Sequence, residues 1–229
     1  MTTSILPSAY LGARSGDGES PGMPEPVQSP AEAPSIRMAG LADIPGIARI
    51  TTEGPQPEVG DTAVMSTATR LLLTNVAFEH GALWLEEVDD GPVARAVIAV
   101  PAGELLSQHS LLRDAIRRLG RPAAPPPLPV FGFGEVLLAE LKLVRPVWLL
   151  IEISKPSQNL TGDPALLDAA LQWARGRSGA AGEPVMVLTD TMPERRAAER
   201  LGFVERRTWG RHWPWWLGVA APVARLSGA

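Results

Sequence analysis

The chain has 229 residues, a net charge of −4 and no cysteine. This length allows one domain with a well-formed core, and the lack of cysteine excludes disulfides, thiolate zinc sites and a cysteine nucleophile. The acidic balance argues against a nucleic-acid partner, which normally meets a basic face. The three histidines are far apart and lack the spacing of metal ligands, so we expect no metal site.

The first 35 residues are rich in Pro, Ser, Gly and Glu and show no hydrophobic period. Such a segment buries too little apolar surface to offset the entropy of ordering it. It predicts a flexible extension at 1–35 that precedes a domain at 36–229. No apolar run reaches the roughly 18 residues of a membrane span, and the start lacks the pattern of a secretory signal. We therefore expect a cytoplasmic protein without a membrane partner.

The first half of the domain contains both strand and helix patterns. Asp43 and Pro45 suit the first turn of a helix, the aspartate as a cap and the proline at the first position. Asp-Gly at 90–91 supplies the positive φ angles of a hairpin turn. In chain order the pattern predicts a strand, two helices and two hairpin strands, at 35–40, 43–50, 61–79, 82–88 and 92–100.

The second half alternates strands with amphipathic helices. Residues 101–145 predict a variable helical insertion that contains a proline-rich loop, and 203–220 predict two strands or a strand and an extended tail. Between these segments we expect strands at 147–154 and 183–190 and helices at 164–177 and 193–202. Strands and helices in one unit indicate a single α/β (α+β) domain, with a mixed twisted sheet of six to seven strands flanked by helices.

The segment from Val147 to Phe203 reads as strand, polar loop, helix, strand and a short helix that ends in Leu201-Gly202-Phe203. This order resembles the cofactor-binding half of the GNAT N-acyltransferases. The long second helix and the helical insertion make the layout most similar to the puromycin N-acetyltransferase-like enzymes. The resemblance implies transfer of an acetyl or other acyl group from coenzyme A, or from carrier-protein pantetheine, to a small-molecule amine such as an antibiotic or other secondary metabolite.

The resemblance also implies where the cofactor binds. In that family the fourth strand splays from the fifth, and its backbone, here at Ile151, Ile153 and Ser154, pairs with the pantetheine arm. The loop that follows takes the pyrophosphate at a helix N-terminus. By resemblance its contacts come from Gln158, Asn159, Leu160, Thr161 and Gly162.

The phosphate loop departs from the family pattern Gln/Arg-x-x-Gly-x-Gly/Ala. Aligned from Pro156, the chain has Asn159 at the first position and keeps only Gly162; aligned on Ala165, it keeps Gln158 but loses both glycines. Asp163 and Pro164 favour a capped helix start, and a capping carboxylate competes with a phosphate for the same N–H groups.

The catalytic residues are also uncertain from the sequence. Many members of the family use a tyrosine of the last helix as general acid, but that position here holds Ala197 or Ala198. Glu152 on the fourth strand is our candidate proton acceptor, with a solvent-exposed or ion-paired strand residue as the alternative. His212, in a tryptophan-rich segment, is the second candidate because histidine titrates near neutral pH.

These departures leave a second hypothesis open. The chain could keep the fold without acetyl-coenzyme A, and bind a hydrophobic metabolite or a partner in the cleft or run a different reaction there. The tryptophans after residue 208 fit either an ordinary core or an apolar substrate wall. A homodimer is a further expectation that the sequence does not decide.

Overall fold

The computed structural model describes residues 35–50, 67, 69–87, 93–119, 134–154, 163–177, 183–209 and 215–220. They all belong to one compact unit, Ala33–Ala229. The predicted extension at 1–35 lies outside the described residues except for Ser35, so its flexibility stays a prediction. No helix in the described part of the chain is both long and apolar enough to cross a membrane.

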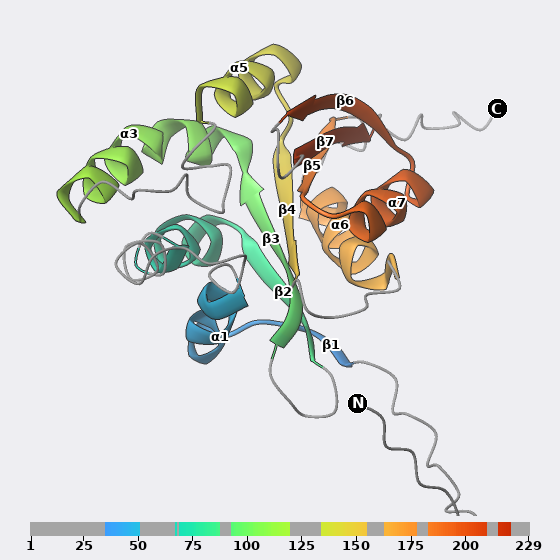
Figure 1. The fold of residues 1–229 in the computed structure, drawn as a ribbon, viewed down its shortest axis with the longest axis horizontal. Helices are drawn as coiled ribbons and strands as arrows, with labels where there is room; N and C mark the ends of the chain where they lie inside the picture. The colour runs from blue at the N-terminus through green and yellow to red at the C-terminus, as the bar shows by residue number, and fades with distance from the viewer. Residues whose placement is uncertain are drawn as a thin grey trace, which may run out of the picture. The chain divides into compact units, whose positions relative to one another are not determined.

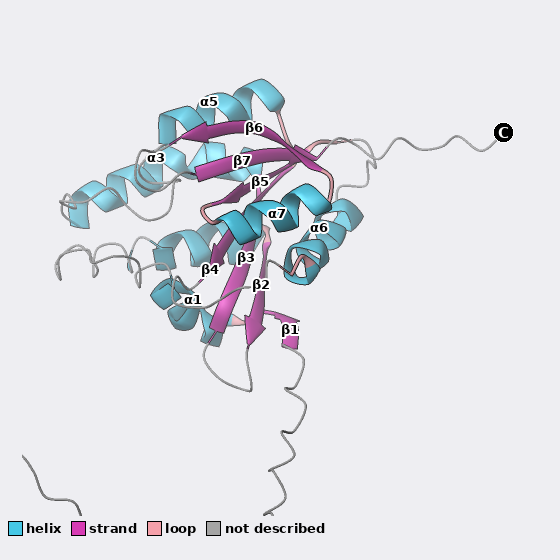
Figure 2. Cartoon of the chain, turned by 45° about the vertical axis from the view of Figure 1, so that its right-hand side comes forward, coloured by secondary structure: helices cyan, strands magenta, loops and turns pink. Residues whose placement is uncertain are grey.

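A seven-stranded mixed sheet forms the centre of this unit, as predicted. Its strands run in the order β1-β2-β3-β4-β5-β7-β6, and only β4 and β5 are parallel neighbours. Figure 2 shows β6 and β7 beside β5, at the opposite end of the sheet from β1. The bounds are β1 Ser35–Met38, β2 Ala82–Glu87, β3 Val93–Pro101, β4 Trp148–Ser154, β5 Val185–Thr189, β6 Phe203–Trp209 and β7 Trp215–Ala220.

Helices cover both faces of the sheet (Figure 1). They are α1 Ile44–Ile50, which follows the 3-10 turn η1 Leu41–Asp43, the π-helical turn η2 Leu73–Phe78, α3 Ala102–Leu119, α5 Gly134–Val144, α6 Ala165–Arg177 and α7 Met192–Arg200. Within the insertion at 101–145, the pattern SLLRDAIRRLG predicts a helix that starts near 110. This start is too late: α3 begins directly after β3, where Glu104 in its first turn complements the helix dipole.

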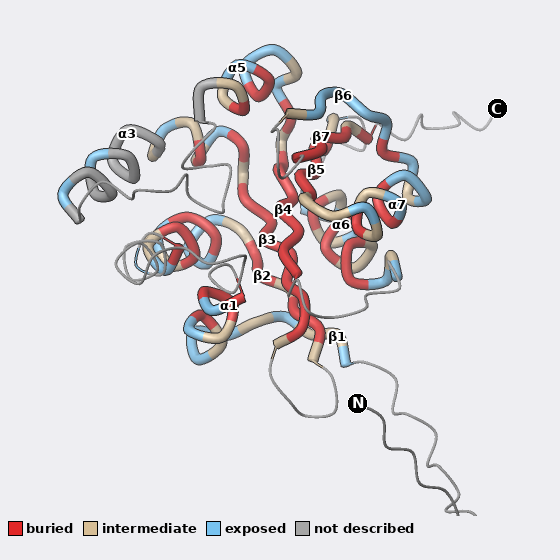
Figure 3. Tube along the Cα trace, viewed as in Figure 1, coloured by how far each residue is buried: buried red, intermediate tan, exposed pale blue. Residues whose placement is uncertain are grey.

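Two hydrophobic layers lie on opposite faces of the sheet. One packs α1, η2, α3 and α5 against alternate residues of β3 and β4, and the other packs α6 and α7 against the residues between them. Trp215 belongs to the first layer and Trp216 to the second, so β7 places a tryptophan on each face of the sheet. Figure 3 shows that β3, β4 and β5 are buried, whereas most of β6 is exposed.

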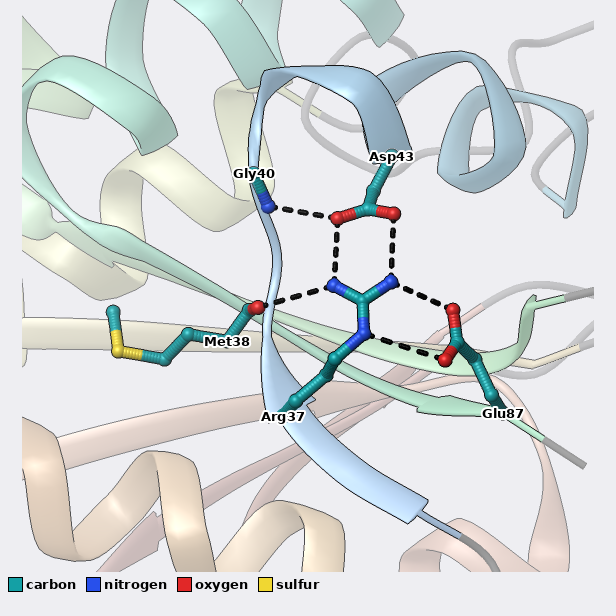
Figure 4. Close-up of polar contacts among 5 residues, drawn as sticks. All are labelled: Arg37, Met38, Gly40, Asp43 and Glu87. Atoms are coloured by element: carbon teal, nitrogen blue, oxygen red, sulfur yellow. Dashed lines mark hydrogen bonds and ion pairs between the residues drawn. The ribbon is translucent and has the colours of Figure 1, made fainter. Parts of the chain in front are cut away.

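Ion pairs of Arg37 connect β1 to β2 and to η1 (Figure 4). Arg37 donates to both carboxylate oxygens of Asp43, at 2.8 and 2.9 Å, and to both of Glu87. The hydrogen bonds from Arg37 lower the pKa of the Asp43 carboxyl. Asp43 also accepts the backbone N–H of Gly40, so it caps the turn before α1 rather than the first turn of α1 itself.

Gly81 joins η2 to β2 at a point where two backbones nearly touch. A Cβ at this position would collide with the carbonyl oxygen of Ala99 on β3 and lie 3.0 Å from that of Ala77. We expect Gly81→Ala to lower the free energy of unfolding by about 2–3 kcal/mol, because backbone atoms have to move. Urea unfolding measures this free energy.

The control is Gly103→Ala in α3, where a Cβ meets nothing within 4 Å. Alanine at this position should stabilise the helix by about 0.5–1 kcal/mol. Equal effects on stability at Gly81 and Gly103 would contradict the prediction.

Candidate functional site

The pairing between the parallel strands β4 and β5 ends halfway along β4. Their pairing runs from Trp148 opposite Val185 to Ile151 opposite Leu188, whereas β4 stays paired with β3 as far as Ser154. Beyond Ile151, β3 is therefore the one partner strand that β4 keeps in the described sheet. β5 itself ends at Thr189, so the edge of β4 from Glu152 to Ser154 carries main-chain N–H and C=O groups outside the described β4–β5 ladder.

Glu152 is the first residue of β4 beyond this separation. Its side chain is fully buried on the face that α6 covers, the face to which Leu150 also belongs. Arg95 of β3 donates to its Oε1 at 2.5 Å and, through the other terminal nitrogen, to Oε2 of Glu86 at 2.9 Å. Arg95 is itself 1% exposed. The candidate proton acceptor is therefore one end of a buried Glu86–Arg95–Glu152 triad.

The triad also contacts the start of α6. Arg95 donates to the carbonyl oxygen of Asp163 at 3.1 Å, and Oδ1 of Asp163 accepts the backbone N–H of Ala165 at 2.9 Å. The carbonyl oxygen of Pro164 accepts from Asp168, so proline occupies the first turn. The predicted Asp-Pro helix start is confirmed, and the capping carboxylate occupies one of the N–H groups at this helix end.

A second buried carboxyl group, Glu194, comes from the first turn of α7. Thr191 caps this helix, and its Oγ1 accepts the backbone N–H of Glu194 at 3.3 Å. Glu194 shares a helix face with Ala197 and Ala198, three and four residues on, and all three are fully buried. Neither carboxylate oxygen of Glu194 has a hydrogen-bond partner among the described residues.

The surroundings of Glu152 favour the protonated form of its carboxyl group. Burial raises the pKa of its carboxyl group, the charge of Glu194 raises it further and Asp190 adds a smaller effect, so that the pKa reaches about 8. The charge and hydrogen bond of Arg95 oppose this rise. They do not cancel it, because one guanidinium group serves both Glu86 and Glu152 while Glu194 also acts on it.

The structure describes only some of the remaining predicted site residues. Ile151 and Ile153 are buried in the layer opposite to Glu152, and the hydroxyl group of Ser154 has no hydrogen-bond partner within the described chain. The loop residues Gln158, Asn159, Leu160, Thr161 and Gly162, and the second catalytic candidate His212, lie outside the described residues.

Sequence reasoning missed Glu86, Arg95 and Glu194. Arg95 did leave a signal, because it is the one charged residue in the apolar strand PVARAVIAV, and a charge in a buried strand requires a partner. Glu194 left a weaker signal, since it shares a helix face with two alanines on a short and otherwise charged helix. Glu199 of the same helix, by contrast, forms an ion pair with Arg195 at 2.8 Å.

Comparison with known proteins supports the fold. No family model matches the chain, and no curated protein does. Among solved structures, a histone acetyltransferase and related acetyltransferase of Corynebacterium glutamicum is 19% identical with a TM-score of 0.51, covering 84% of this chain and 98% of its own.

Two further structures are more distant. The polyamine N-acetyltransferase of Drosophila melanogaster is 15% identical, with a TM-score of 0.47 and coverage of 82% and 100%. An acetyltransferase of Salmonella typhimurium, solved with acetyl-coenzyme A, is 14% identical, with a TM-score of 0.45 and coverage of 86% and 99%. The sheet order and the similarity to the Corynebacterium structure together show that this chain has the GNAT fold.

Proposed function

We propose that the chain is an N-acyltransferase, which moves an acetyl or other acyl group from coenzyme A or carrier-protein pantetheine to an amine of a small molecule. The observation that carries this proposal is the unpaired edge of β4 beyond Ile151, beside a buried carboxyl group whose pKa is about 8. This edge offers main-chain groups to an extended ligand, and the carboxyl group can exchange a proton near neutral pH.

The backbone edge from Glu152 to Ser154 fits the pantetheine arm. A peptide-like arm can pair with such an edge as an added strand would, and the bound thioester would supply an activated acyl group. Main-chain N–H groups of this segment are the available donors for a carbonyl oxygen on which negative charge develops. These contacts require no particular side chain at Ile151, Ile153 or Ser154.

Glu152 is the residue to which we assign proton transfer. An amine attacks only as the neutral base, so a proton has to leave it during amide formation. A carboxyl group with a pKa of about 8 is matched to this exchange at physiological pH. The hydrogen bond from Arg95 fixes the side chain while Oε2 is left without a partner in the described structure.

The start of α6 favours the second hypothesis, a GNAT-fold protein that does not use acetyl-coenzyme A. The carboxylate of Asp163 already accepts the N–H of Ala165 and places negative charge where a pyrophosphate would bind. At an exposed helix end this opposition costs about 1 kcal/mol. It weakens coenzyme A binding without preventing it, so we retain the acyltransferase as the proposed function.

We expect acetyl-coenzyme A to bind, with an affinity that falls as salt is raised, because part of the attraction is between phosphates and the end of α6. Isothermal titration calorimetry at several salt concentrations measures this affinity. Asp163→Gly should tighten binding about fivefold, the equivalent of about 1 kcal/mol. The matched control is Asp168→Asn, which removes a charge from the same helix turn but leaves the cap on Ala165 intact; its affinity should change less.

A flat titration at millimolar acetyl-coenzyme A, with the fold intact by circular dichroism, would contradict the acyltransferase proposal. In that event, binding of hydrophobic metabolites to the same protein becomes the experiment of choice. Tighter binding by both Asp163→Gly and Asp168→Asn to the same extent would show that overall charge, and not the cap, opposes the phosphates.

A further inference from the structure

Arg95 is a buried cation whose contacts reach β2, β4 and the start of α6. It lies on β3 opposite Glu86 of β2 and Ser154 of β4, and paired residues of neighbouring strands point to the same face of a sheet. Glu152, two residues before Ser154 on β4, points to this face as well. The guanidinium group is therefore held among three strands of the sheet, where it is buried from solvent.

One terminal nitrogen of Arg95 joins the proposed proton acceptor to the start of α6. Nη2 donates to Oε1 of Glu152 at 2.5 Å and to the carbonyl oxygen of Asp163 at 3.1 Å, while Nη1 donates to Glu86 at 2.9 Å. Nη2 carries two hydrogens, and these two bonds use both of them. Nε has no hydrogen-bond partner among the described residues. A rotation of the guanidinium group toward Glu152 or Asp163 therefore disturbs its bond to the other residue.

The two acceptors of Nη2 belong to two different parts of the proposed reaction. Glu152 begins the unpaired edge of β4 and is the residue to which proton transfer is assigned. Asp163 caps α6 through the N–H of Ala165, at the helix end where the phosphates of the donor would bind. A shift of this helix end on donor binding would move the carbonyl oxygen of Asp163 and, through Arg95, would act on the side chain of Glu152.

We propose that Arg95 is a positioning residue that links donor binding at the start of α6 to the orientation of Glu152. It acts through the two residues that it holds and needs no contact with the donor or the amine. Packed strands hold a side chain more precisely than a loop does, and a misplaced catalytic group lowers turnover. This assignment rests on the proposed acyltransferase.

Arg95→Lys separates positioning from charge. Lysine keeps the positive charge, but its ammonium group is a single point that cannot serve three acceptors as the planar guanidinium group does. We expect turnover to fall about tenfold or more, within the range that misplacement causes. The affinity for acetyl-coenzyme A should fall about fivefold, the equivalent of one lost hydrogen bond. Steady-state kinetics and isothermal titration calorimetry measure the two effects, and urea unfolding shows that the variant is folded.

The double variant Arg95→Lys with Glu152→Gln distinguishes positioning from general damage to the fold. Its turnover should equal that of Glu152→Gln alone, because the carboxyl group that Arg95 positions is gone. Its loss of affinity for acetyl-coenzyme A should persist, because that effect passes through Asp163. A further tenfold fall in turnover, on the scale of the misplacement effect, would overturn the proposal.

The matched control is Arg37→Lys, which makes the same substitution at an arginine that also bridges two carboxylates. Its turnover and its affinity for acetyl-coenzyme A should equal those of the parent protein. Losses in Arg37→Lys as large as those in Arg95→Lys would overturn the proposal, since they would show that any bridging arginine has this effect.

The parent protein gives a second test, which does not require Arg95→Lys to fold. In nitrogen-15 NMR of the arginine side chains, we expect Glu152→Gln to shift the guanidinium signal of Arg95 and thereby to assign it. Saturating coenzyme A should shift the same signal in the parent protein, and an unchanged signal would overturn the link. Failure of acetyl-coenzyme A to bind would remove the proposed function and the link with it, whereas acyl transfer with an unchanged Arg95 signal would remove only the link.

Discussion

Glu152→Gln should reduce the turnover of acyl transfer to an identified amine by about 10²-fold, the scale of general acid–base catalysis. Glutamine has nearly the same volume, and its amide oxygen can still accept the hydrogen bond that Arg95 gives to Oε1, so the fold should survive. What the variant loses is the ability to bind and release a proton. Steady-state kinetics with acetyl-coenzyme A as donor measures the effect, and higher pH should restore part of the rate because the amine then loses its proton unaided.

Glu199→Gln is the control for this measurement, since Glu199 lies on α7 in an exposed ion pair with Arg195. Its turnover should equal that of the parent protein. Full activity of Glu152→Gln would show that the carboxyl group is not required, and would transfer the assignment to His212 or to a mechanism of positioning alone.

The same variant should change how stability depends on pH. The pKa of Glu152 is about 8 in the folded chain against an ordinary value near 4.5, so between these values the folded protein binds more protons than the unfolded one. The free energy of unfolding of the parent protein therefore falls across this window, by on the order of 2–5 kcal/mol from this group. Urea unfolding of Glu152→Gln should lack this contribution, and above pH 8 the variant should be the more stable protein.

Local sequence patterns predicted most of the fold, because each signal acts within one element. The apolar run VWLLIEIS indicated a strand, and β4 spans Trp148–Ser154 of it, with every residue buried. Asp163 and Pro164 indicated the start of α6, where the cap is present. The start of α3 was placed too late, because Gly103 in its first turn weakens the helical pattern there.

The candidate site was predicted less completely, because its contacts join residues far apart in sequence. Arg95 and Glu152 are 57 positions apart, and they meet only because of the register between β3 and β4, in which a shift of one residue would turn either side chain to the opposite face. Thr191 and Glu194 show the spacing of a capping box, which suggests a surface glutamate. Only the threonine half of that box is present, and the Glu194 side chain is buried instead.

Arg95→Met should be the most destabilising of these substitutions, at about 3–5 kcal/mol at pH 7. Methionine replaces the stem of the arginine but leaves the buried carboxyl groups of Glu86 and Glu152 without the donor that they share, and buried polar groups that lose their partner are costly. The hydrogen bond to the carbonyl oxygen of Asp163 is lost as well, so the start of α6 should become less protected. Urea unfolding gives the free energy, and amide hydrogen exchange reports the protection of α6.

Arg37→Met is a matched control, because Arg37 also joins two carboxylates, Asp43 and Glu87. Its side chain is 41% exposed whereas that of Arg95 is 2% exposed, and exposed ion pairs contribute only about 0–1 kcal/mol. The second test is the double variant Arg95→Met with Glu152→Gln, which removes one of the stranded carboxylates. It should be more stable than Arg95→Met alone. Equal costs for Arg95→Met and Arg37→Met, or additive effects in the double variant, would mean that the buried triad does not act as a unit.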